Sequence, residues 1–224
     1  MNSHVPIITI DGASGVGKGT LAFSLAAKLG YKLLDSGAIY RALALYAIDL
    51  NIDLEDSAKL AKIAHNIPLR FEKNSKGLDI FLGEKNITVN LRLEQTGTFA
   101  SILAKHNDVR QALIAFQKNF ANEPGLIADG RDMGTCIFPD AKIKLFLHAS
   151  AQIRAQRRFE QLLKQGFSAT MPNLIDDINA RDHRDRTRAV SPLIAAEDAL
   201  IIDTSSLDGD QVFKLAWNYI ESKI

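Results

Sequence analysis

Nine consecutive residues near the N-terminus have the types and the spacing of a phosphate-binding loop. They read Gly12-Ala13-Ser14-Gly15-Val16-Gly17-Lys18-Gly19-Thr20, behind the apolar run Pro6–Ile10 and ahead of a helix-forming stretch. Glycines let the backbone curl so that successive N–H groups point at a polyphosphate, and the N-terminus of the following helix adds positive dipole charge. The amino group of Lys18 suits the terminal phosphates. A glycine-rich turn with an incidental lysine is much less favoured, because both the strand and the helix are in place.

The residue after Lys18 departs from the commonest pattern. Many nucleotide hydrolases carry there the Ser or Thr that ligates magnesium, whereas this chain has Gly19 and places its hydroxyl at Thr20. Either Thr20 assists, or the metal is held through water and through carboxylates elsewhere. The ending Gly-Lys-Gly-Thr resembles the loops of nucleoside monophosphate kinases. It favours a kinase for a small acceptor over a switch GTPase.

A second polar turn follows the second expected strand. It reads Leu34-Asp35-Ser36-Gly37, and Arg41 comes one helical turn later. The hydroxyl of Ser36 can donate a hydrogen bond, and the guanidinium of Arg41 can fork onto two phosphate oxygens. An ordinary helix cap at Asp35 or Ser36 with a solvated arginine explains the pattern equally well on its own. The nearby phosphate loop favours an anion site.

The third expected strand runs into Asp129-Gly130-Arg131-Asp132. A carboxylate at the end of a buried strand organises magnesium in phosphoryl-transfer sites, which suggests that role for Asp129. Arg131 suits a phosphate, and Asp132 suits an exocyclic amine or a ribose hydroxyl. A salt bridge at the rim of the sheet is the alternative, and such exposed pairs contribute little to stability.

The fourth cluster lies in a charged segment, residues 181–188. On a helix, Arg181, Arg184, Asp185 and Arg188 fall at i, i+3, i+4 and i+7 and share one face. Three guanidinium groups with one carboxylate favour an anion as their partner, and in phosphoryl transfer mobile arginines neutralise the transferred group. Asp182 and Arg186, on another face, can pair locally at i, i+4. We expect the turn-rich segment 166–172 to act as the hinge of a lid that expels water. A solvated, salt-bridged helix or a nucleic-acid surface is the alternative.

Composition limits the classes of protein that fit. The chain has 224 residues, a formal net charge of +1 and one cysteine, Cys136. Bulk charge therefore argues for neither a nucleic acid nor a membrane as partner, and a single cysteine excludes an internal disulfide and suits a reducing compartment. The first residues show no leader pattern and no apolar run reaches membrane-spanning length. We expect a soluble, cytoplasmic monomer.

The order of the expected elements predicts an α/β fold. Apolar runs end at Ile10, Leu34, Ala128, Leu147 and Ile202, and helical patterns cover residues 18–29, 38–50, 109–120, 151–165 and 211–222. Alternation of this kind predicts a five-stranded parallel sheet flanked by helices, with ligands beyond the carboxyl ends of the strands. Residues 68–72 and 78–82 read as an antiparallel hairpin followed by a helix at about 92–105. We expect a core domain (1–66, 106–165 and 190–224), a small antiparallel β insertion (67–105) and a short Arg-rich helical lid (166–189).

Taken together, these segments resemble the bacterial cytidylate kinase family over nearly the full chain. The matching segments are the phosphate loop, residues 34–41, residues 126–135 and residues 181–193, the last two being far more specific than the loop. The hairpin resembles the acceptor-side insertion of that family. The resemblance implies Mg-dependent transfer of the γ-phosphoryl group of ATP to CMP or dCMP. Departures are small: Ala13, Val16, His183 and Thr187 replace other residues, and none removes an expected contact.

The resemblance also implies roles for single residues. The loop Gly12–Thr20 would hold the ATP phosphates. From the residues themselves we expect no direct protein ligand to magnesium, with Thr20 and Asp129 as the candidates to hold it through water. The residues implied for the acceptor phosphate are Ser36, Arg41, Arg131 and Arg188, and we place Asp35 beside them. Those implied for the cytosine are Ser101, Arg110 and Asp132, and those for the sugar are Arg181 and Asp185. We assign catalysis to Lys18, Arg131, Arg181 and Arg188.

The sequence leaves several alternatives open for single residues and for the function of the chain. Chemistry alone makes Ser101 and Arg110 ordinary surface residues. Of the neighbours Arg157 and Arg158, either could stack on a nucleotide base or be solvated, and we assign Arg158 to ATP. A kinase for UMP or another small acceptor is one alternative, and for a hydroxyl acceptor Asp35 is the candidate base. An RNA-binding protein using residues 181–188 is another, although the near-neutral charge and the lack of an aromatic platform argue against it.

Overall fold

A computed structural model describes residues 5–74, 77–164, 166 and 168–223. The chain divides into two compact units. The first comprises Met1–Leu34 and Lys118–Ile224, and the second comprises Asp35–Gln117. The phosphate loop and the charged helix belong to the first unit, and the Ser36–Arg41 segment belongs to the second.

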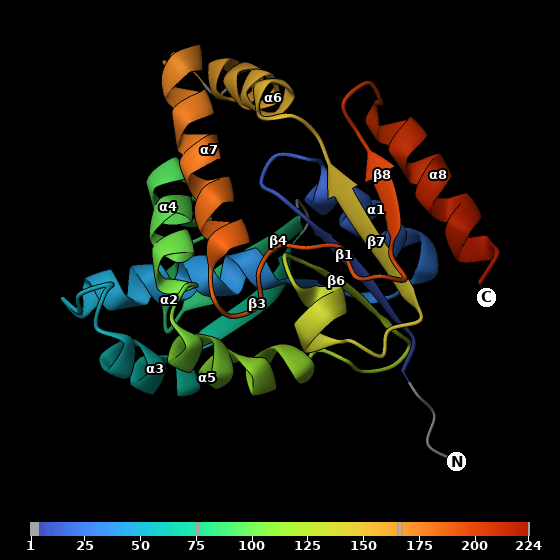
Figure 1. Ribbon diagram of the computed structural model, residues 1–224. Coiled ribbons are helices and arrows are strands. Elements are labelled where there is room, and N and C mark those ends of the chain that lie inside the picture. Colours follow the sequence, from blue (N-terminus) through green and yellow to red (C-terminus); the bar gives the residue numbers. More distant parts are fainter. Residues whose placement is uncertain (1–4, 75–76, 165, 167, 224) are drawn as a thin grey trace. The chain divides into compact units, whose positions relative to one another are not determined.

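A five-stranded parallel sheet organises the first unit (Figure 1), with the order β2-β6-β1-β7-β8. Its strands are β1 (Ile7–Gly12), β2 (Lys32–Asp35), β6 (Leu126–Gly130), β7 (Ile143–His148) and β8 (Leu200–Asp203). In the centre, Ile8 of β1 is in register with Ile127 of β6 and Ile143 of β7. All three side chains are buried. Burial on both faces explains why the central strands are continuous apolar runs and not alternating ones.

Helices of the first unit pack in pairs. The helix α1 (Lys18–Leu29) packs against α8 (Gly209–Glu221), and α6 (Ala151–Lys164) packs against α7 (Met171–Thr187). Figure 1 shows α7, in orange, running beside α6. A π-helical turn, η2 (Met133–Ile137), follows the end of β6 after two intervening residues. Consequently the turn that carries Arg131 and Asp132 ends in a short helix.

The second unit is mainly helical with a small antiparallel sheet. Its helices are α2 (Ser36–Asp49), α3 (Ser57–His65), η1 (Asn90–Arg92), α4 (Glu94–Leu103) and most of α5 (Asn107–Lys118). Its sheet has the order β3-β4-β5, with β3 (Leu69–Asn74), β4 (Gly77–Leu82) and β5 (Lys85–Asn86). The helix α2 packs on α4, and Leu43, Leu60, Leu103 and Leu113 are fully buried. This unit therefore has an apolar core of its own.

The predicted α/β class, the parallel sheet and the small antiparallel sheet are confirmed. Three details were missed or wrong. The helix α3 was not predicted, and β5 adds a strand to the expected hairpin. Met171 and Pro172 belong to α7 and not to a turn, because proline in the first turn of a helix sacrifices no hydrogen bond. Ser75 and Lys76 of the expected hairpin turn, and Gln165 and Phe167 near the expected hinge, lie outside the described residues.

Among the described helices, none combines the length and the apolar character needed to cross a bilayer. The subdivision into core, insertion and lid stays a prediction.

Candidate active site

The phosphate loop joins β1 to α1 in the conformation that its glycines allow. Gly17 caps α1 with φ 96°, in the left-handed region that favours glycine. At Gly12, a Cβ atom would lie 2.2 Å from the carbonyl oxygen of Leu147, so the loop passes too close to β7 for any larger residue. The Nζ of Lys18 donates to the carbonyl oxygen of Ala13, 2.9 Å away across the loop. The loop thus folds around the amino group of Lys18, the group predicted to bind the terminal phosphates.

Asp129, at the carboxyl end of β6, faces this loop. One of its carboxylate oxygens lies 3.8 Å from the Nζ of Lys18, and a Cβ on Gly19 would lie 3.6 Å from the other. A Cβ on Gly19 would thus make an ordinary van der Waals contact with the Asp129 carboxylate. Magnesium binds carboxylate, hydroxyl and water oxygens, so Asp129 and the hydroxyl of Thr20 have donor atoms of the kind that a water-held magnesium ion needs.

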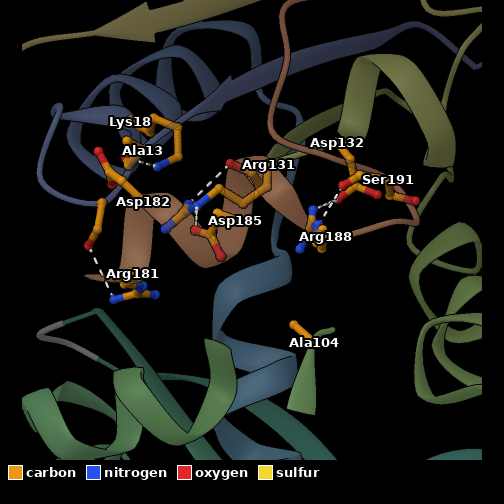
Figure 2. A network of polar contacts seen from close by, with 12 residues as sticks. Ala13, Lys18, Ala104, Arg131, Asp132, Arg181, Asp182, Asp185, Arg188 and Ser191 are labelled. Atoms are coloured by element: carbon orange, nitrogen blue, oxygen red, sulfur yellow. Dashed lines mark hydrogen bonds and ion pairs between the residues drawn. The ribbon is translucent and has the colours of Figure 1, made fainter. Parts of the chain in front are cut away.

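Asp185 of α7 is the buried centre of the arginine cluster. Its carboxylate accepts a hydrogen bond of 2.9 Å from the Nε of Arg131 (Figure 2). Burial alone would raise the pKa of Asp185, but the charges of Arg131, Arg181 and Arg188 outweigh it, and the pKa lies below its usual value. Burial likewise opposes the charge on Arg131, yet Asp185 and further carboxylates hold the pKa of Arg131 above its usual value. The pair is ionised throughout the physiological range.

Two further arginines extend the cluster in opposite directions. The Nη1 of Arg181 lies 3.3 Å from the hydroxyl oxygen of Ser14 in the phosphate loop. The Nε of Arg188 donates to the carbonyl oxygen of Ser191 at 2.5 Å, and one of its Nη atoms lies 3.7 Å from the Asp132 carboxylate. Figure 2 shows Arg188 beside Asp132 and Ser191, and Arg181 on the other side of the Arg131–Asp185 pair. Within the first unit, the structure therefore brings together the phosphate loop, Arg131, Asp132, Arg181, Asp185 and Arg188.

A second buried ion pair in this region was missed. Arg154 of α6 meets Asp182 of α7 through two hydrogen bonds of 3.0 and 2.5 Å, and it also donates to the carbonyl oxygens of Ser14 and Ala149 at 3.1 Å. Asp182 thus meets Arg154 and not Arg186, the local partner that the helical spacing allows, because α6 packs against α7. Nothing in the spacing of Arg154 distinguishes it from the less buried arginines of the same helix, Arg157 and Arg158.

A cavity of about 310 Å³ adjoins the phosphate loop. It is lined by Val16, Thr20, Arg157, Thr204, Leu207 and Phe213, among others. Arg157 donates to the backbone carbonyl oxygen of Thr204, and the Thr204 hydroxyl donates to the carbonyl oxygen of Val16 at 3.1 Å. Arg158 is not among the lining residues, and its Nη1 donates to Gln161 on its own helix at 2.9 Å. Of the two adjacent arginines, the one at the cavity is Arg157.

In the second unit, the N-terminal end of α2 carries the residues expected to bind an anion: the N-cap Asp35, Ser36 in the first turn and Arg41 one turn later. The Asp35 carboxylate accepts a hydrogen bond from the backbone N–H of Ala38 at 2.9 Å, so Asp35 caps the helix. The Ser36 hydroxyl donates to the side chain of Gln117 at 2.7 Å. The Nη1 of Arg41 donates to the carbonyl oxygen of Leu91 at 2.6 Å. These contacts orient Ser36 and Arg41 within their own unit.

Ser101 and Arg110 are buried, with 5% and 4% of their surfaces exposed. The expectation from chemistry alone, that they are surface residues, is wrong. The Arg110 guanidinium lies 5.6 Å from the centre of the Tyr40 ring and donates to the carbonyl oxygen of Ala104 at 3.4 Å. Burying a guanidinium is costly, so contacts inside this unit must compensate for the burial of Arg110.

Comparison with known proteins gives consistent results. The family model described as cytidylate kinase matches residues 8–222. The chain is 49% identical to the cytidylate kinase of Proteus mirabilis over 96% of both chains, and 48% identical to that of Vibrio cholerae over the full length of both. An uncharacterized protein of Eubacterium ventriosum shares the fold, with a TM-score of 0.51, 15% sequence identity and coverage of 97% of this chain and 98% of its own.

Proposed function

The chain belongs to the cytidylate kinase family and is thus a phosphotransferase acting on CMP and dCMP with ATP as co-substrate, and from this premise we propose which of its residues carry out the transfer. The observation that carries the proposal is the cluster of Arg131, Arg181 and Arg188 around the buried carboxylate of Asp185. Its link to the phosphate loop through Ser14 supports a role in transferring a phosphoryl group.

ATP is bound by its phosphates and by its base. The backbone N–H groups of Gly12–Thr20 and the amino group of Lys18 hold the phosphates. The adenine occupies the cavity beside the loop, against Arg157. Thr20 and Asp129 would hold magnesium through water, and the bound ion would neutralise charge on the phosphate oxygens.

The acceptor phosphate is taken up by Asp35, Ser36, Arg41, Arg131 and Arg188. Arg41 and Arg188 are already oriented by backbone carbonyl oxygens, which supports their role because little side-chain freedom is then lost on binding. Arginine suits this task since its planar fork matches two phosphate oxygens at once.

The cytosine is read by Ser101, Arg110 and Asp132. Cytosine carries an exocyclic amino group that donates hydrogen bonds, whereas uracil presents an oxygen that only accepts them. A carboxylate such as Asp132 accepts from the amino group and repels the uracil oxygen, which gives discrimination by both attraction and repulsion. Arg181 and Asp185 contact the sugar, and Arg181 reaches the transferred phosphoryl group as well.

The chemistry needs no general base. The acceptor phosphate is already an anionic nucleophile, so the protein contributes by positioning and by neutralising charge. Lys18, Arg131, Arg181 and Arg188 carry the positive charge that faces the equatorial oxygens of the transferred group. We take α7 as a closing lid whose arginines complete the site and exclude water.

The test is ADP formation from Mg-ATP with CMP, dCMP, UMP, AMP, GMP or no acceptor, measured side by side. We expect strong turnover with CMP and dCMP, weaker turnover with UMP, and none above background otherwise. In the variants Asp132→Ala and Arg110→Ala, the preference for CMP over UMP should fall. Unchanged preference in both variants would refute their assignment to the cytosine, while absence of turnover with any acceptor would refute the activity itself.

A further inference from the structure

Asp11 is a buried carboxylate that none of the steps above uses. It is the last residue of β1 before Gly12, where the phosphate loop begins, and only 5% of its surface is exposed. An ionised side chain in such a position is costly to bury. The contacts of the Asp11 side chain must therefore account for its burial.

Both oxygens of Asp11 are engaged by the same short segment. One accepts a hydrogen bond from the backbone N–H of Met133, and the other accepts from the backbone N–H of Gly134, each at 2.8 Å. These are the first two residues of η2, where N–H groups have no partner within the helix itself. The segment has no side-chain cap of its own, since Asp132 makes no cap hydrogen bond. Asp11 therefore supplies the cap from a different strand.

The capped segment directly follows the residues that face the acceptor. Asp132 precedes Met133, and its carboxylate lies 3.7 Å from Arg188. The packing around the cap is tight. A Cβ on Gly134 would lie 2.8 Å from the Thr9 hydroxyl oxygen and 3.4 Å from an oxygen of Asp11. The position of the Asp132 backbone is thus set by a residue that adjoins the phosphate loop.

We propose that Asp11 is a positioning residue for acceptor recognition: its carboxylate clamps the backbone of Met133 and Gly134 and thereby holds Asp132 in place to read the cytosine. This inference rests on the proposed role of Asp132. A carboxylate is required because it offers two acceptor oxygens, whereas an amide offers one oxygen and turns a donor toward the other N–H.

The ionisation of Asp11 gives the clamp a pH dependence. Burial, helped by the charge of Asp132, raises the pKa of Asp11 to about 7, against the hydrogen bonds from Gly134 and Met133 and the charge of Lys18. The charged groups around it are Lys18 from α1, Asp132 from the turn before η2, and Lys144 from β7, whose side chain packs at Gly134 and whose Nζ binds Asp198. Protonation converts one acceptor oxygen into a hydroxyl and weakens one of the two clamp bonds.

The test compares the Asp11→Asn variant with the wild type in steady-state kinetics. We expect KM for CMP to rise about tenfold, the loss that corresponds to one hydrogen bond to a charged group, while KM for ATP changes less than about twofold. The matched control is Ile10→Val, a change in the fully buried preceding residue of the same strand, which lowers the melting temperature without touching the clamp. Its KM for CMP should equal that of the wild type.

A pH series from 8 to 6 adds a readout that a purely structural role would not move. In the wild type, KM for CMP should rise toward pH 6 more steeply than in Asp11→Asn, the titration of CMP itself being common to both. Equal KM values for CMP in the wild type and Asp11→Asn would overturn the inference. Equal increases in KM for CMP and KM for ATP in Asp11→Asn would also overturn it. So would a rise in KM for CMP no larger than the rise in Ile10→Val. A wild type that fails to phosphorylate CMP would instead refute the proposed function.

Discussion

The Arg154–Asp182 pair offers a sharp test of how α6 and α7 are held together. In Asp182→Asn, the guanidinium of Arg154 keeps its hydrogen bonds to the carbonyl oxygens of Ser14 and Ala149 but loses its counter-charge. Arg154 is only 2% exposed and the Asp182 side chain 12%, so water cannot compensate for the loss.

Breaking a buried ion pair by removing one partner costs about 3–5 kcal/mol. We expect the lower end, about 3 kcal/mol, because the amide still accepts one hydrogen bond. For a chain of this size that free energy corresponds to a decrease in melting temperature of about 6–12 °C. The assay is thermal unfolding followed by circular dichroism, with Asp177→Asn as the control, since Asp177 lies exposed on the same helix.

A double variant separates the charge from the packing. Arg154→Met leaves the Asp182 carboxylate buried without its partner, and Arg154→Met with Asp182→Leu removes both charges. The double variant should therefore be more stable than Arg154→Met alone. A melting temperature for Asp182→Asn within about 2 °C of that of Asp177→Asn would refute the reasoning, because that difference is below one kcal/mol for this chain length.

Three further predictions concern catalysis, donor binding and pH. Lys18→Ala should lower kcat by about 10²–10³, since it removes a charge that stabilises the transition state, with circular dichroism checking that the fold persists; wild-type turnover would contradict the role. Arg157→Ala should raise KM for ATP and leave KM for CMP unchanged, and equal effects on both would argue against the adenine cavity. Because the folded-state pKa of Asp11 lies above its ordinary value of 3.8, its contribution to the free energy of unfolding is fully present below pH 3.8 and declines as pH rises through about 7. Urea unfolding at several pH values should show this decline as a difference between the wild type and Asp11→Asn, and identical pH dependence in the two would disprove it.

Much of the fold could be predicted because its signals are local. Each strand of the main sheet is a short apolar run, and each helix between them carries a periodic apolar face, so the alternation is visible along the chain. The helix α3 was not predicted because it is short and only its residues Leu60 and Ala64 are buried. The start of α7 was misplaced because Pro172 reads as a turn signal, although proline is equally at home in the first turn of a helix.

The site was only partly predictable, for a different reason. Arg181, Asp185 and Arg188 share a helix face by spacing alone, and the glycines with Lys18 define the loop without any tertiary information. Helical spacing does not say which partner a charged side chain meets, however.

The sequence by itself therefore determined the phosphate loop, the α/β order and the family, because these are written in consecutive residues and their spacing. Only the tertiary structure decided that Asp182 meets Arg154, that Arg157 faces the cavity, that Arg110 is buried against Tyr40 and that Asp11 caps η2. Each of these contacts joins residues far apart in the chain. Between the neighbours Arg157 and Arg158, the orientation of α6 decides which side chain reaches the cavity. Such contacts depend on how helices and strands pack, and packing depends on the whole chain and not on any local pattern.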